Sequence, residues 1–389
     1  MRIRQCRPRH YCGVALTLGL FSFLPAQTPP QASPPPSRLA IYYGYPSLVN
    51  GSNGDVEKAA LIFAAYDVVV LGDGLEFADR HNGRVPEGDP EEHEKTRQII
   101  ASVHRHNPAT RFFGYVCLGD IVLPQREAVV LSPEELKERI GLWKRMGVAG
   151  IFLDEAGYDY PEVTRKRQNL AIALIHEQGL SAFMNAYFLD HLFGVDDSPA
   201  NANGSGKNPD HQPSRLDKRD LLLLESFTVK NGAYESPVAW KPRIDQAMAY
   251  RRRYGVQIFS TTTSAEGTPF SARQFTYAWW TARLYGVDGF SWGEPNFAAS
   301  NNTLPDRRCQ AADTTRSTLP SSPPDWVDRK WFWKNSSNSA VIVDTSDHSV
   351  RIVHGSIAAG QTDVATFLRS TRTAGSLVPC SAAPMDHEH

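Results

Sequence analysis

The chain has 389 residues, of which 41% are hydrophobic and 10% aromatic, so it is long enough to bury one large core. Its 41 Lys and Arg residues nearly balance its 42 Asp and Glu residues, and the net charge of -1 excludes a general electrostatic attraction to nucleic acid or to anionic membranes. The sequence contains no CxxC or HExxH motif, and we expect neither a metal nor a cofactor.

The N-terminus has the layout of a secretory signal peptide, which predicts a secreted or periplasmic protein. Four arginines between Arg2 and Arg9 precede an apolar run from Val14 to Leu24, and small or turn-forming residues follow up to Ala26. The run is about half of the roughly 20 apolar residues that a membrane span needs. We therefore assign residues 1–26 to the signal peptide and the proline-rich residues 27–37 to a semi-extended linker.

From Arg38 onward, short apolar runs alternate with helical patterns, which is typical of parallel strands with crossover helices. The predicted strands are Leu39–Tyr43, Val68–Leu71, Phe112–Cys117, Gly150–Leu153, Ala182–Met184, Leu221–Leu224, Gln257–Ser260 and Gly289–Ser291. The predicted helices are Asp55–Ala65, Glu91–His104, Pro133–Met146, Glu162–Gln178, Ile244–Tyr254 and Ala272–Tyr285. Eight strands in regular alternation predict a (β/α)₈ TIM barrel over residues 38–296.

Two further segments depart from this alternation. Residues Phe193–Asp220 are rich in turn-forming residues, which is typical of a cleft wall or of a disordered insertion, and we expect a mobile wall of the cleft. Residues 297–389 predict a linker and a small β-rich region whose Trp326, Trp331, Phe332 and Trp333 form its core or bind sugar. In an oxidising compartment Cys309 is expected to pair with Cys380, whereas Cys117 belongs to an apolar strand.

Carboxylates follow several of the predicted strands, at the end of a parallel barrel where active sites lie. Asp154 and Glu155 follow one strongly apolar strand and Glu225 follows another, while Asp73 and Glu294 come after two more. An unpaired carboxylate at the tip of a buried strand costs several kcal/mol, so such groups point to function. Hydrolysis of a glycoside needs two carboxyl groups about 5–10 Å apart. The tips of strands four and six can face each other at that distance, and we predict Asp154 and Glu225 as the catalytic pair.

Aromatic and amide side chains at other strand ends fit a sugar-binding cleft. Aromatic rings stack on the apolar faces of pyranose rings, and amides bind sugar hydroxyl groups. The predicted substrate-binding residues are Glu155, Asp73, Tyr42, Tyr45, Tyr115, Asn185, Tyr187, Trp292 and Glu294.

Four segments resemble the endo-α-1,4-polygalactosaminidase and spherulin-type glycoside hydrolases. They are FGYV at 113–116, GIFLDE at 150–155, MNAY at 184–187 and ESF at 225–227. The resemblance implies a secreted barrel that cuts galactosamine-containing exopolysaccharide. It also implies that Asp154 is the nucleophile, that Glu225 is the acid/base, and that Glu155 tunes the charge or binds substrate. We expect a monomer whose partner is the polysaccharide substrate.

Two other functions stay open at this point. A barrel of this kind can bind polysaccharide without cutting it. The pentapeptide GFSWG at 289–293 also matches the GxSxG pattern of serine esterases, with Ser291 as nucleophile and His348 or His354 downstream. The residues that follow, Glu294 to Asn296, favour a loop over the required strand–turn–helix context.

Overall fold

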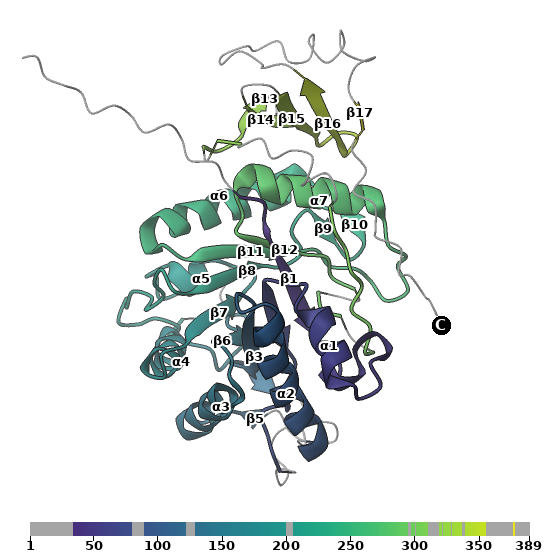
Figure 1. Ribbon diagram of the computed structural model, residues 1–389. Coiled ribbons are helices and arrows are strands. Elements are labelled where there is room, and N and C mark those ends of the chain that lie inside the picture. The colour runs from purple at the N-terminus through teal and green to yellow at the C-terminus, as the bar shows by residue number, and fades with distance from the viewer. Residues whose placement is uncertain are drawn as a thin grey trace, which may run out of the picture.

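Eight parallel strands close into a barrel in the computed structural model, which confirms the predicted fold class (Figure 1). In chain order the barrel strands are β1 (Ser37–Tyr42), β2 (Val68–Leu71), β3 (Arg111–Cys117), β6 (Gly150–Asp154), β7 (Ser181–Asn185), β8 (Leu221–Leu224), β11 (Gln257–Thr261) and β12 (Gly289–Ser291). Their order around the barrel is the order along the chain. The structure describes residues 34–79, 89–121, 129–199, 205–294, 297–299, 301–309, 319–320, 322–327, 329–336, 339–354 and 376–377.

Helices cover the outside of the barrel, and their ends follow sequence signals. They are α1 (Val56–Phe63), α2 (Pro90–His106), α3 (Pro133–Met146), α4 (Arg165–Glu177), α6 (Pro237–Tyr254) and α7 (Ala272–Tyr285). Helix α3 begins with a capping box: the backbone N–H of Glu135 donates to the Ser132 hydroxyl, and the Ser132 N–H donates to the Glu135 carboxylate. Such caps satisfy the first N–H groups of a helix, which have no partner within it.

Alternation along the strands decides which side chains fill the barrel. One buried cluster consists of inward-facing residues, namely Leu39, Ile41, Val68, Val70, Phe113, Phe152, Phe183, Leu221, Leu223 and Phe259. Glycine is required where a neighbouring ring crosses the backbone: a Cβ on Gly150 would lie 2.3 Å from Phe113, and one on Gly289 would lie 2.1 Å from Phe259. The next inward position on each strand, two residues further on, lies at the C-terminal mouth.

The connection from β7 to β8 contains only the four-residue helix α5 (Asp190–Phe193) before the long predicted insertion. Residues 205–220 of that insertion are anchored against the loop before α4. The Lys207 ammonium, only 5% exposed, donates to the carbonyl oxygens of Tyr160, Pro161 and Val163. The buried Asn208 side chain also binds the carbonyls of Val195 and Gln212. The expectation of a mobile wall is therefore wrong for this part, because buried polar groups fix it.

Bends and a turn, rather than a helix, follow β12 in the described part of the sequence, and an isolated parallel bridge then joins Ala299 to Tyr42. The N–H of Ala299 donates to the Ile41 carbonyl, and the N–H of Tyr43 donates to the Ala299 carbonyl, both at 2.8 Å. Residues 297–299 thus continue the barrel wall beside β1, beyond the predicted barrel boundary at 296. Cys309, further along this segment, is disulfide-bonded, whereas Cys117 is free and buried. Cys380 lies outside the described residues, so its pairing with Cys309 stays a prediction.

A five-stranded antiparallel sheet follows the barrel and packs on α6 and α7 (Figure 1). Its strands, in sheet order, are β13 (Asp325–Val327), β14 (Trp331–Asn335), β15 (Ser339–Asp344), β16 (Ser349–His354) and β17 (Ser376–Leu377). Phe332 lies against both Trp240 of α6 and Tyr285 of α7, and stacks on Trp326 at 4.5 Å. Trp326 and Phe332 therefore belong to the core shared by sheet and barrel.

Two short hairpins complete the described structure, β4 (Asp120–Ile121) with β5 (Val129–Val130) and β9 (Val229–Lys230) with β10 (Ala233–Tyr234). In the described ranges, no helix has both the length and the apolar character needed to cross a bilayer. The predicted signal peptide and most of the predicted linker lie outside those ranges.

Candidate active site

Asp154 is the last residue of β6, two positions beyond the inward-facing Phe152. Its Oδ1 atom accepts hydrogen bonds from the Asn185 amide at 2.8 Å and from the backbone N–H of Glu155 at 3.0 Å, and the Tyr115 side chain is a third donor. Glu155 has a left-handed backbone, with φ of 52°, so the chain turns sharply directly after Asp154. The Asp154 carboxylate is therefore held by three donors.

Glu225 directly follows β8, two positions beyond the inward-facing Leu223. Its Oε2 atom accepts a hydrogen bond from the Asn185 amide at 3.0 Å. The Glu225 carbonyl accepts another from the Arg243 guanidinium of α6 at 2.7 Å. The next residues have positive φ values, 56° at Ser226 and 63° at Thr228, and such a backbone is strained for β-branched Thr228. The chain turns sharply here, immediately after presenting the carboxylate.

Asn185 ends β7, the strand between β6 and β8, and one nitrogen of its side chain contacts both acids. The nitrogen and not the oxygen must face them, because two carboxylates accept hydrogen bonds and repel an amide oxygen. The shared nitrogen limits the distance between Asp154 Oδ1 and Glu225 Oε2 to at most about 5.8 Å, the sum of the two bond lengths. If the two N–H bonds of the Asn185 amide point about 120° apart, these two carboxyl oxygens lie about 5 Å apart.

The two carboxyl groups have different surroundings, and these determine which one holds a proton. Burial raises the pKa of Asp154, and its donors Asn185, Glu155 N–H and Tyr115 oppose the shift. Burial also raises the pKa of Glu225; the charge of Asp154 adds to this, while the Asn185 hydrogen bond and the charges of Arg243 and Lys230 oppose it. With three donors against one for its side chain, Asp154 is the better place for the negative charge. Of the two groups, Glu225 is then the better place for a proton.

Tyrosine hydroxyl groups surround this pair. Tyr43 and Tyr115 pack edge to face with ring centroids 5.5 Å apart, and the charge of Asp154 raises the pKa of both beyond the effect of burial. The charges of Glu155, Asp154 and Glu225 likewise add to the burial that raises the pKa of Tyr160. Sequence reasoning identified Tyr115 and missed Tyr43 and Tyr160. Strand alternation could have identified Tyr43: side chains two residues apart on a strand share a face, and Leu39 and Ile41 face inward.

Tyr42 and Tyr45 do not join the acids. Tyr42 is fully buried between β1 and α1, where its ring meets Phe63 at 5.3 Å and its hydroxyl donates to the Tyr45 carbonyl. The prediction of Tyr42 as a substrate-binding residue is wrong, because its side chain points outward from the barrel and packs against α1. Tyr45 is 48% exposed after the end of β1, and its backbone N–H is bound by Asn302.

Asp73, Trp292 and Glu294 are engaged in packing or ion pairs. Asp73 pairs with the buried Arg139, which also pairs with Glu76, although the Asp73 charge still reaches Tyr43. The Trp292 ring packs against Phe270 and Phe275 at 5.5 and 5.9 Å. Glu294 accepts from Arg307 at 3.1 Å. Asp73 and Glu294 are thus paired with arginines, and the Trp292 ring is packed although its Nε1 atom has no hydrogen-bond partner in the described structure. The structure supplies no support for the expected roles of these residues in substrate binding.

Glu155 and Tyr187, in contrast, lie beside the pair. The Glu155 carboxylate accepts from the Cys117 thiol at 3.2 Å, next to Asp154. The Tyr187 ring lies under two cations, the Arg243 guanidinium at 4.3 Å and the Lys230 ammonium at 4.7 Å. Both cations also oppose the rise in the pKa of Glu225. Acidic groups therefore gather on the Asp154 side of the mouth and cations on the Glu225 side.

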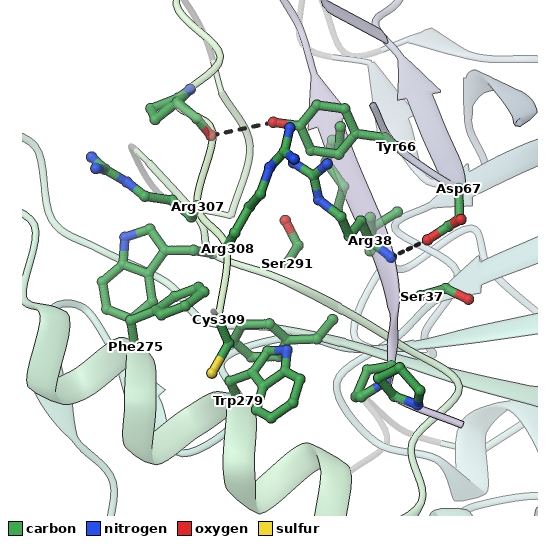
Figure 2. A pocket seen from close by; sticks show the side chains of 18 of the residues that line it. Ser37, Arg38, Tyr66, Asp67, Phe275, Trp279, Ser291, Arg307, Arg308 and Cys309 are labelled. Carbon is green, nitrogen blue, oxygen red and sulfur yellow. Dashed lines mark hydrogen bonds between the residues drawn. The ribbon is translucent and has the colours of Figure 1, made fainter. Parts of the chain in front are cut away.

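Two other features lie away from the acids. A pocket of about 490 Å³ lies between the start of β1, helix α7 and residues 304–309, with Ser291, Trp279 and Arg308 in its lining (Figure 2). His176, Asp217 and Asp220 approach one another before β8, at the opposite end of the barrel. Asp220 there accepts from two backbone N–H groups and from His176, so its carboxylate is already satisfied.

No protein-family model and no curated protein matches the chain. Among solved structures, it is similar to 2,3-dimethylmalate lyase, a PEP mutase/isocitrate lyase superfamily member, with 12% identity over 66% of this chain and 74% of that one and a TM-score of 0.34. It is also similar to tryptophan synthase subunit alpha from Legionella pneumophila str. Paris, with 11% identity over 65% and 79% of the two chains and a TM-score of 0.34. It is similar as well to the carboxyl transferase domain of Rhizobium etli pyruvate carboxylase, with 11% identity over 68% of this chain and 40% of that one and a TM-score of 0.38. Likeness of this degree says nothing about chemistry.

Proposed function

We propose that this chain is a secreted or periplasmic glycoside hydrolase that cuts an amino-sugar polysaccharide, as an endo-α-1,4-polygalactosaminidase does. The observation that carries the proposal is the Asn185 amide, which donates to both Asp154 and Glu225. It supports a separation of about 5 Å between the carboxyl oxygens, and retaining glycosidases hold their two carboxyl groups about 5–5.5 Å apart. An inverting enzyme needs about 6.5–9.5 Å to admit water between them.

The mechanism assigns the two steps of retention to these acids. Ionised Asp154 attacks the anomeric carbon and forms a glycosyl ester, while the proton of Glu225 moves to the departing glycosidic oxygen. Glu225, now ionised, then removes a proton from water, whose oxygen displaces Asp154 from the same carbon. The unequal hydrogen bonding of the two carboxyl groups supports this order, because Asp154 starts charged and Glu225 starts protonated.

Reducing-end release from a panel of amino-sugar and neutral polysaccharides tests this function. Asp154→Asn and Glu225→Gln keep the shape of each side chain, and each should lower turnover at least about a thousandfold. Glu177→Gln makes the same chemical change at an exposed position of α4 and should leave turnover unchanged. The anomer released first, read by NMR, should have the configuration of the substrate. Near-parental turnover in either acid variant would refute the assignment.

Failure of the parent to cleave the panel would favour a barrel that only binds polysaccharide. The esterase interpretation lacks structural support. Ser291 is 7% exposed, and in the described structure its side chain forms no hydrogen bond with a histidine. The His348 ring stacks instead on Tyr234 at 3.7 Å. The described residues that follow β12 also form no helix, whereas a nucleophile elbow requires one there.

A further inference from the structure

A second, small cavity lies beside the acid pair, behind Tyr187. Its volume is about 110 Å³, and it lies between the segment that follows β7 and the first turns of α6. Arg243 links it to the proposed catalytic site, because this side chain lines the cavity and also donates to the Glu225 carbonyl at 2.7 Å. A group bound in the cavity would therefore sit next to the proposed acid/base.

Two buried donors at this cavity lack an acceptor. His191 is fully buried, and its Nδ1 atom accepts a hydrogen bond from the Tyr158 N–H at 3.1 Å and lies 3.5 Å from the Asp159 carboxylate. A neutral ring that accepts at Nδ1 carries its proton on Nε2. That Nε2 atom and the Nε atom of Arg243 are both buried without a hydrogen-bond partner in the described structure. Buried polar groups are normally satisfied, so unmet donors at a cavity indicate a ligand oxygen.

The remaining lining is mostly apolar. Phe188, Leu189 and Pro199 contribute hydrocarbon surface. The one carboxylate, Asp190, is exposed and is already bound by Gln246 and Tyr250. The charge of Arg243 acts on the nearby Glu235 carboxyl group, so the cavity has little unbalanced charge that calls for an anion. Two free donors beside an apolar wall fit a neutral carbonyl that carries a small alkyl group.

We propose that this cavity binds the acylamino group of an N-acetylated hexosamine unit next to the bond that is cut. The carbonyl oxygen accepts from His191 Nε2 and Arg243 Nε, and the methyl group contacts Phe188, Leu189 and Pro199. The placement next to a cleaved bond rests on the proposed hydrolase function. The recognition of the acetyl group does not, since it can be measured as binding alone.

The test compares binding of N-acetylgalactosamine oligosaccharides with that of the same oligosaccharides after de-N-acetylation. Calorimetry on the Asp154→Asn variant avoids turnover, and the N-acetylated form should bind at least about tenfold more tightly, as expected for satisfying buried donors. Adding Arg243→Gln should reduce the preference to less than about threefold. Arg243→Lys should do the same, because lysine keeps the charge and lacks the Nε donor. Arg252→Gln removes an exposed arginine from the same helix and should leave the preference intact.

The outcomes separate the two proposals. The proposed acyl-binding cavity would be overturned if Asp154→Asn bound both oligosaccharides equally, or if the preference survived both Arg243 substitutions. In either case, cleavage by the parent would still uphold the hydrolase. Conversely, an Arg243-dependent preference in a protein that cleaves none of the polysaccharides would uphold the cavity and refute the hydrolase.

Discussion

Removing the Asn185 side chain should move the pH dependence of catalysis upward. Asn185→Ala deletes the one nitrogen that donates to both carboxylates. A hydrogen bond to a charged group contributes about 1.5–3 kcal/mol, and each pKa unit corresponds to about 1.4 kcal/mol. Loss of the bond should therefore raise the pKa of each acid by about one to two units. The acidic limb of the pH–rate profile reports ionised Asp154, and the basic limb reports protonated Glu225, so both limbs move to higher pH.

The two limbs should not move equally. Asp154 keeps the Glu155 N–H and Tyr115 as donors, whereas Glu225 loses the side-chain donor that holds it. The basic limb should thus shift further than the acidic limb, and the bell should widen. The assay is kcat/KM against pH on whichever polysaccharide the parent cleaves. Asn169→Ala is the matched control, because it deletes a buried amide of α4 that forms hydrogen bonds with the backbone of Arg215 and Pro213. A profile of Asn185→Ala that coincides with that of the parent would refute the reasoning.

Two further predictions concern stability. Burial and the charge of Asp73 raise the pKa of Glu76 to about 7, although the charge of Arg139 opposes the shift. The stability that this group contributes below pH 4.5 is therefore lost as the pH rises through about 7, and the unfolding free energy from urea titrations should fall by up to about 3 kcal/mol over this window. Glu76→Gln should remove this part of the pH dependence. An equal slope in parent and variant would contradict the assignment. Lys207→Met should lower the unfolding free energy by about 2–4 kcal/mol in the same assay, because three carbonyl oxygens lose their buried donor. A decrease of less than about 0.5 kcal/mol, as for a typical surface substitution, would show that the insertion is not anchored there.

The correct predictions of the barrel and of its strand ends rest mainly on short apolar runs and on the order of the strands along the chain. Apolar runs such as those before Asp154 and Glu225 fixed strand ends within one or two residues, and parallel strands bring their ends to one mouth. Asn185 was also selected by its place at a strand end. Its contact with both acids was not, because that depends on the register of β7 against both neighbours.

The errors came from features that a strand pattern does not contain. Aromatic content alone does not distinguish Tyr42 from Tyr43, whereas a shift of one residue moves a side chain to the other face of the strand, and only Tyr43 faces the inside of the barrel. Asp73 satisfies the strand-end rule, but its partner Arg139 comes from helix α3, 66 residues later. The anchoring of the insertion by Lys207 is equally nonlocal, since turn-rich composition predicts exposure unless a tertiary contact supplies partners.

The shared core of barrel and sheet means that the chain is not modular. Phe332, Val341 and Val350 belong to the same buried cluster as Trp240 and Trp280 of the outer barrel helices. A chain ended after the last barrel strand would leave those tryptophans facing water, and large exposed apolar patches favour aggregation. The sheet is therefore an outer layer of the barrel rather than a detachable accessory, and grafting this barrel onto another protein requires carrying the sheet with it.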